Sequence, residues 1–134
     1  MTTNLKTKSD HNLIASDLLL QNALPAASIH CSYYACVQLM LHMLYSHFSM
    51  NETDIEVDMR HSSKKTMHVW LIKIFFDKIS SKPDKRTFNS KINQLKGLRV
   101  KADYENVSIS DEDASKSFQY SKEIIVILKN HFSV

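Results

Sequence analysis

The sequence predicts an all-α protein, folded as an up-and-down bundle of about five helices. Turn residues are scarce, since the 134 residues include one glycine and two prolines, whereas a sheet protein needs such residues at every hairpin. Apolar residues also recur at helical spacing in several long segments. The hydrophobic fraction of 43% is enough for one core. We expect one domain over residues 10–134, preceded by a flexible polar N-terminus over residues 1–9.

Two predicted helices occupy the first third of the chain. The first runs from about residue 10 to residue 24, with an apolar side made of Leu13, Ile14, Leu18 and Leu20. Pro25 ends it or begins the next helix, because proline is well tolerated at a first helical position. The second helix, about residues 25–48, has apolar stripes at positions 30, 34, 37, 41, 44, 48 and at 33, 37, 40, 44. Two adjacent stripes predict burial on more than one face, as expected for the central helix of a bundle.

Three more helices are predicted after a polar segment over residues 51–65, which we expect to be a surface loop. They cover about residues 66–80, 84–105 and 111–131, and Pro83 marks the break between the first two. Ser110 followed by Asp113 is similar to a capping box at the start of the last helix. Gly97 lies inside a helix, where it costs about 1 kcal/mol relative to alanine. It therefore either admits another helix closely or permits a kink before Arg99.

The charge and the cysteines set further limits. The 17 basic and 14 acidic residues give a net charge of +3, which permits phosphate binding without requiring it. Cys31 and Cys36 are five residues apart on one predicted helix, so they point to different faces and are expected to remain free thiols. The polar start of the chain does not resemble a signal peptide, and no apolar run is long enough for a membrane span. We expect a cytoplasmic protein with no membrane partner.

Familiar cofactor and metal motifs do not occur in the sequence. It contains no Walker loop, no GxGxxG and no HExxH, and no cysteines and histidines have the spacing of a zinc site. The seven histidines are scattered along the chain. We therefore expect no metal and no cofactor.

Two segments place polar and aromatic groups inside otherwise apolar helices. They are Leu98-Arg99-Val100-Lys101-Ala102-Asp103-Tyr104 and, far upstream, Ser32-Tyr33-Tyr34-Ala35. Polar groups on buried helix faces are costly unless they are paired or used. A guanidinium, a carboxylate and a phenol within six residues therefore suggest a functional site, with Tyr33 and Tyr34 as its opposing wall. The structural alternative is a salt bridge along the helix between Arg99 and Asp103, four residues apart, with Tyr104 as an aromatic core anchor.

The order of three motifs resembles the HEPN domain family over residues 10–132. The motifs are Ser32-Tyr33-Tyr34-Ala35, then Leu98-Arg99-x-x-Ala102-Asp103-Tyr104, then Ser110-x-x-Asp113-Ala114. The resemblance implies an all-helical bundle that usually forms a homodimer. It also implies RNA cleavage or the binding of nucleotide or RNA, often beside a separately encoded nucleotidyltransferase partner in a toxin–antitoxin or defence system.

Ribonucleases of that family carry a histidine a few residues after the arginine, whereas Tyr104 stands at that place here. Arg99 and Tyr104 are then the catalytic candidates, but tyrosine, with an ordinary pKa near ~10, is a poor base. Arg99 is suited to holding a phosphate through two parallel hydrogen bonds. We therefore expect ligand binding first, in a groove shaped by the residues His30, Tyr33, Tyr34, Asp103 and Tyr104 around Arg99.

Two alternatives remain open from the sequence. One is a metal-independent endoribonuclease in which Arg99 works with a displaced histidine, either His30 or His68, from another helix or across a dimer interface. The other is a non-catalytic helical adaptor that joins protein partners through its apolar helix faces.

Overall fold

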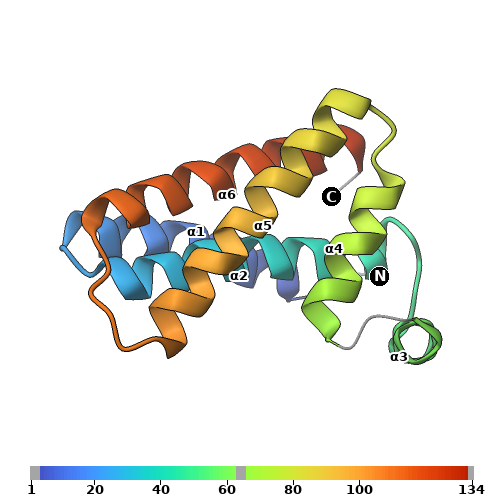
Figure 1. The fold of residues 1–134 in the computed structure, drawn as a ribbon. Helices are drawn as coiled ribbons and strands as arrows, with labels where there is room; N and C mark the ends of the chain where they lie inside the picture. The colour runs from blue at the N-terminus through green and yellow to red at the C-terminus, as the bar shows by residue number, and fades with distance from the viewer. Residues whose placement is uncertain (1–3, 63–65, 133–134) are drawn as a thin grey trace.

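The computed structural model describes residues 4–62 and 66–132, and in these ranges it contains six helices and no strand (Figure 1). The helices are α1 (Leu5–Gln21), α2 (Pro25–Ser46), α3 (Glu52–His61), α4 (Met67–Lys78), α5 (Lys82–Tyr104) and α6 (Asp111–His131). The all-α prediction is confirmed, whereas the expected count of five helices is wrong. The additional helix is α3, in the segment predicted to be a loop.

A capping box starts α3. The Asn51 side chain accepts a hydrogen bond from the Asp54 amide at 2.8 Å, and the Asp54 carboxylate accepts one from the Asn51 amide at 3.0 Å. Ile55 is the buried residue of α3. Local capping thus makes a helix from a sequence that has little apolar pattern. Residues 63–65 of the predicted loop lie outside the described residues.

The first helix begins at Leu5 rather than near residue 10, so residues 5–9 of the predicted flexible segment are helical. The Ser9 hydroxyl donates a hydrogen bond of 2.6 Å to the carbonyl oxygen of Ala35 on α2. This contact anchors the early turns of α1 to the central helix. Residues 1–3 lie outside the described residues.

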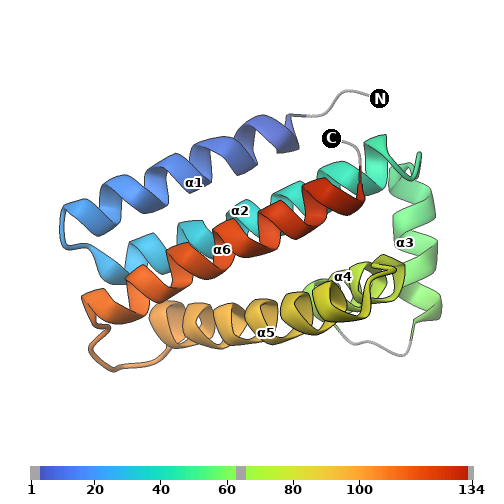
Figure 2. The same cartoon turned by 90° about the horizontal axis from the view of Figure 1, so that it is seen from above.

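Helices α1, α2 and α6 run roughly alongside one another, and α5 crosses α2 and α6 obliquely (Figure 1), while the four helices alternate in direction along the chain (Figure 2). The central helix α2 contacts α1, α4, α5 and α6. The shorter α4 packs across one end of the bundle, against α2 and α5. This arrangement brings the start of α4 to the late part of α5.

Residues of α2 supply much of the core. Tyr33, Val37, Met40 and Leu44, the second predicted stripe, are all buried. The first stripe is buried only in part, because His30 is exposed and Tyr34 and Leu41 are half-buried. His30 and Tyr34, the less buried part of that stripe, therefore lie at the surface, beside other aromatic residues.

The predicted apolar side of α1 does not match its buried face. Ile14 and Leu18 are 59% and 54% exposed, whereas Ser9 and Ser16 are buried. The Ser16 hydroxyl donates to the Ser28 carbonyl oxygen at 3.0 Å, and the Ser28 hydroxyl donates to the Ser16 carbonyl oxygen at 2.7 Å. Small hydroxyl side chains let the two backbones approach, so this serine seam replaces the predicted leucine contact.

Three further predictions, on the cysteines, on Gly97 and on membrane spans, can be compared with the structure. Cys31 and Cys36 are free thiols, as predicted. Helix α5 is continuous through Gly97, and a Cβ built there meets nothing within 4 Å. Within the described residues, therefore, no other helix uses Gly97 for close approach. None of the described helices is both long and apolar enough to cross a membrane.

Candidate functional site

Arg99 lies on α5 one turn before its end and is buried, with 6% of its surface exposed. Its guanidinium faces two other helices. Nη2 lies 3.4 Å from Nδ1 of His68 on α4, and the central carbon lies 4.9 Å from the ring centre of Tyr33 on α2. Long-range packing of α2, α4 and α5 thus creates a polar cluster around one buried cation.

The charge of Arg99 is compensated incompletely. Its Nη1 lies 3.7 Å from Oδ2 of Asp103, beyond hydrogen-bond distance, and the same oxygen accepts a 2.9 Å bond from Nδ1 of His30. Arg99 Nε is buried and has no hydrogen-bond partner among the residues that the structure describes. A buried donor without a partner costs about 1–3 kcal/mol, and more when the group is charged. The salt bridge along the helix that the sequence offered as the alternative is thus present at 3.7 Å, but it involves a buried arginine and does not engage Nε.

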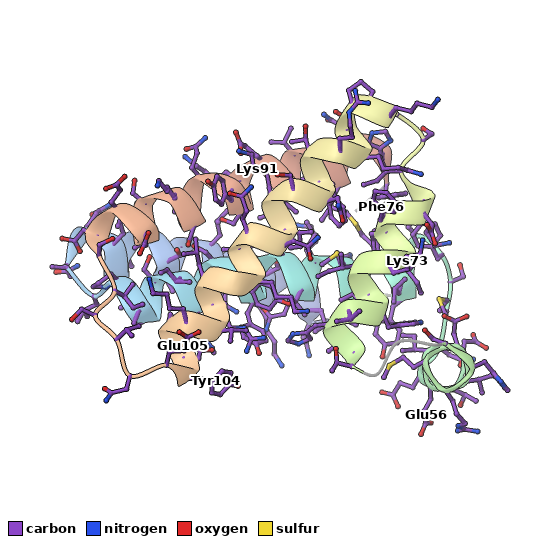
Figure 3. The ribbon with its side chains drawn as sticks, in the orientation of Figure 1. Glu56, Lys73, Phe76, Lys91, Tyr104 and Glu105 are labelled. Atoms are coloured by element: carbon purple, nitrogen blue, oxygen red, sulfur yellow. The ribbon has the colours of Figure 1, made fainter. Side chains whose placement is uncertain are left out.

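Tyrosine rings frame the guanidinium. Its central carbon lies 5.8 Å from the ring centre of Tyr34 and 5.6 Å from that of Tyr104, within the range of cation–π attraction. Tyr34 is half-buried, whereas Tyr104 is 74% exposed and extends from the end of α5 (Figure 3). The two rings therefore form an aromatic border between the buried cation and solvent.

Tyr33 is fully buried behind this border. Burial raises its pKa to about 12, although the nearby Arg99 acts in the opposite direction. The phenol consequently stays protonated near neutral pH. Its hydroxyl lies 3.0 Å from Nδ1 of His68, within hydrogen-bond distance.

The hydrogen bonds fix the tautomer of His68. A guanidinium has only donors, so in the contact with Arg99 the acceptor is the single lone pair of His68 Nδ1, which the Tyr33 hydroxyl also approaches, and the ring proton is assigned to Nε2. Burial lowers the pKa of His68, and the positive charges of Arg99 and Lys96 lower it further. His68 is therefore a neutral side chain with a donor available at Nε2.

A pocket of about 450 Å³ opens at this cluster. Its lining comes from three helices and is made of Tyr34, Thr66, Met67, His68, Val69, Lys96, Arg99 and Tyr104. The volume falls in the range of small-molecule sites, about 300–1,000 Å³. A hollow of similar size between α5 and α6, beside Asp84 and Val126, has no buried cation in its wall.

Three of the predicted site residues, Arg99, Tyr34 and Tyr104, line the pocket. The other three do not line the pocket but contact residues that do. Tyr33 contacts His68, Asp103 contacts Arg99, and His30 contacts Tyr34. The sequence analysis named His68 only as a possible partner of Arg99 in the ribonuclease alternative, and it did not include Lys96, Thr66, Met67 or Val69 in the site. Lys96 lies three residues before Arg99 on the same helix, so helical spacing is the signal that could have found it.

The described residues contain no group of three or more His, Cys, Asp or Glu side chains arranged to hold a metal ion. The chemistry of the pocket is instead that of cations, backbone amides and aromatic rings. No protein-family model matches this chain, and no curated protein matches it either.

Proposed function

We propose that the protein is a HEPN-like helical domain that binds nucleotide or RNA in the pocket beside Arg99. The observation that carries the proposal is the buried guanidinium of Arg99, whose Nε has no partner and which lines an open hollow. A phosphate oxygen supplies the negative charge and the acceptors that such a group lacks. Lys96, in the same wall, adds a second cation.

The aromatic border supports a ligand that contains a base. Tyr104 and Tyr34 present rings at the mouth of the pocket, and Tyr104 is mostly exposed. Stacking of a base on such a ring contributes about 1–3 kcal/mol and does not depend on sequence. A cation at the floor and aromatic rings at the rim suit a nucleotide in which phosphate and base are both accessible, as in single-stranded RNA.

The family resemblance extends the proposal to assembly. It includes a homodimer and a nucleotidyltransferase partner protein, as expected from the sequence motifs. Light scattering of the purified protein measures the first, and co-purification with a co-expressed nucleotidyltransferase measures the second.

Binding is tested by fluorescence anisotropy with a labelled single-stranded RNA. We expect Arg99→Gln to weaken binding by at least about tenfold, because a charge-assisted hydrogen bond contributes about 1.5–3 kcal/mol. Lys82→Gln is the matched control, since exposed Lys82 lies about 20 Å along α5 from Lys96. Equal binding by Arg99→Gln and the unmodified protein would exclude this pocket as the RNA site and would favour the adaptor alternative.

A second candidate function is metal-independent RNA cleavage with Arg99 and His68. The 3.4 Å separation between Arg99 Nη2 and His68 Nδ1 favours it, because such cleavage needs a cation and an acid or base close together. Nδ1 already faces two donors, however, and must be released before it can take a proton. An RNA degradation assay with His68→Asn and Arg99→Ala tests this candidate, and equal degradation by both variants and the unmodified protein would exclude it.

A further inference from the structure

We infer that the ligand group held beside Arg99 is a phosphomonoester, at the end of an RNA strand or on a free nucleotide, seated on the N-terminus of α4. This inference rests on the proposed binding of nucleotide or RNA. It specifies which phosphate enters the pocket and which backbone groups receive it.

The first turn of α4 forms one wall of the pocket through Thr66, Met67, His68 and Val69. The Thr66 hydroxyl caps the helix by accepting a 3.3 Å hydrogen bond from the Val69 amide. The amides of Met67 and His68 precede the intrahelical bonds and have no partner among the residues that the structure describes. Unpaired amides and the positive end of the helix dipole together attract anions.

Arg99 is an independent indication of the same ligand. It is buried, it lines the wall next to α4, and its Nε has no hydrogen-bond partner. It contacts His68 on α4 at 3.4 Å, and the guanidinium and the first turn of α4 line the same pocket. His68 itself offers a donor at Nε2.

The balance of charge and donors favours a terminal phosphate over an internal one. Two cations, Arg99 and Lys96, and a helix N-terminus line the pocket. Asp103, whose carboxylate lies 3.7 Å from Arg99 Nη1 and accepts from His30, offsets only part of this positive charge. A phosphomonoester carries about 1.5–2 negative charges near pH 7 and three acceptor oxygens, whereas an internal phosphodiester carries about one charge. The larger charge and the third oxygen match the surplus of donors.

Isothermal titration calorimetry tests the inference with one short RNA prepared with a 5′-phosphate, with a 3′-phosphate, or with hydroxyls at both ends. Titrations with adenosine monophosphate and with adenosine separate a free nucleotide from an RNA end. We expect a phosphorylated ligand to bind at least about tenfold tighter than its hydroxyl counterpart, since the monoester gains charge-assisted hydrogen bonds.

Met67→Glu and Met67→Gln form the matched pair of variants for the α4 wall. A carboxylate in the first turn stabilises a helix but repels a bound anion. We expect Met67→Glu to lose the preference for the phosphorylated ligand and Met67→Gln to retain it, while both lose the same core packing of Met67 and melt at similar, slightly lower temperatures than the unmodified protein.

The possible outcomes distinguish failure of this inference from failure of the proposed function. RNA that binds equally well with and without a terminal phosphate, in an Arg99-dependent manner, overturns the inference and leaves the proposed function standing. Binding of none of these ligands, or binding that Arg99→Gln does not weaken, overturns both. A phosphate preference that survives Met67→Glu overturns the role of α4.

Discussion

Nδ1 of His68 lies 3.4 Å from Nη2 of Arg99 and 3.0 Å from the Tyr33 hydroxyl, so one imidazole nitrogen faces polar groups from two different helices. The arrangement holds His68 neutral and makes the guanidinium, rather than the imidazole, the charged group of the pocket. It also links the imidazole of His68 to the buried phenol of Tyr33. The titrations of these two side chains can be measured.

The first prediction concerns pH and stability. The folded pKa of His68 is lowered from its ordinary 6.5 by burial and by Arg99, and that of His42 is lowered by burial and by Lys6. As pH falls below 6.5, the unfolded chain binds protons at these sites before the folded protein does, so the free energy of unfolding should fall. Urea unfolding at a series of pH values measures it. His68→Gln should flatten the dependence, and stability that rises between pH 7 and pH 5.5 would contradict the prediction.

Tyr33→Phe should destabilise the protein by about 0.5–1.5 kcal/mol, because it removes one hydrogen bond but keeps the buried ring. It should also raise the pKa of His68, since a donor to the neutral Nδ1 is lost. Chemical denaturation measures the first effect, and NMR titration of the His68 ring measures the second. Tyr45→Phe, at a half-buried position elsewhere on α2, is the control and should leave the His68 titration unchanged.

Gly97→Ala should raise the free energy of unfolding by about 1 kcal/mol. The position lies inside α5, and the added Cβ meets nothing within 4 Å. Thermal melting measures the gain. A lower melting temperature would mean that another molecule or a second copy approaches α5 at this glycine, and a concentration series would then identify self-association.

The serine seam between α1 and α2 gives a paired prediction. Ser16→Leu should destabilise the protein by about 1–3 kcal/mol, because Ser16 is fully buried against α2 and a larger side chain overpacks the seam. Ile14→Ser should change stability by no more than about 0.5 kcal/mol, since Ile14 is 59% exposed. If Ile14→Ser lowers the free energy of unfolding more than Ser16→Leu does in denaturant melts, the leucine-based contact predicted from the sequence would be supported instead.

The only tryptophan of the chain reports on the junction of α3 and α4. The indole nitrogen of Trp70 donates a 2.6 Å hydrogen bond to the Asp58 carboxylate. Asp58→Ala should cost about 1–3 kcal/mol and shift the tryptophan emission. Asp77→Ala removes only an exposed pair with Lys73 and should cost less than about 1 kcal/mol, with unchanged emission. Equal emission spectra for the two variants would show that the bond does not form in solution.

The long amphipathic helices were predictable from the sequence, because most of their buried residues follow apolar spacing. The predicted segments over residues 25–48, 66–80, 84–105 and 111–131 correspond to α2, α4, α5 and α6. The two errors have a common physical cause. Helix α3 depends on a capping box, and α1 packs through serine hydroxyls, and neither contributes to an apolar periodicity.

The candidate site was predictable in part. Arg99, Tyr34 and Tyr104 stood out because polar and aromatic residues interrupt apolar helices, and all three line the pocket. The wall that α4 contributes was not predictable, because nothing in the spacing of His68 and Arg99, 31 residues apart, indicates that their helices cross there. Whether an arginine is buried is likewise decided by the packing of distant segments.

The buried side chains of α1 are serines, whereas every other described helix buries at least one apolar side chain. Lifting α1 away from α2 uncovers Ser9, Ser16, Ser28 and Ser32, whose groups water can satisfy, while the aromatic interior between α2, α4 and α5 stays closed. The N-terminal helix is thus expected to be the first part of the fold to open. Its amides should exchange with solvent far sooner than those of α2, without collapse of the pocket on the opposite flank.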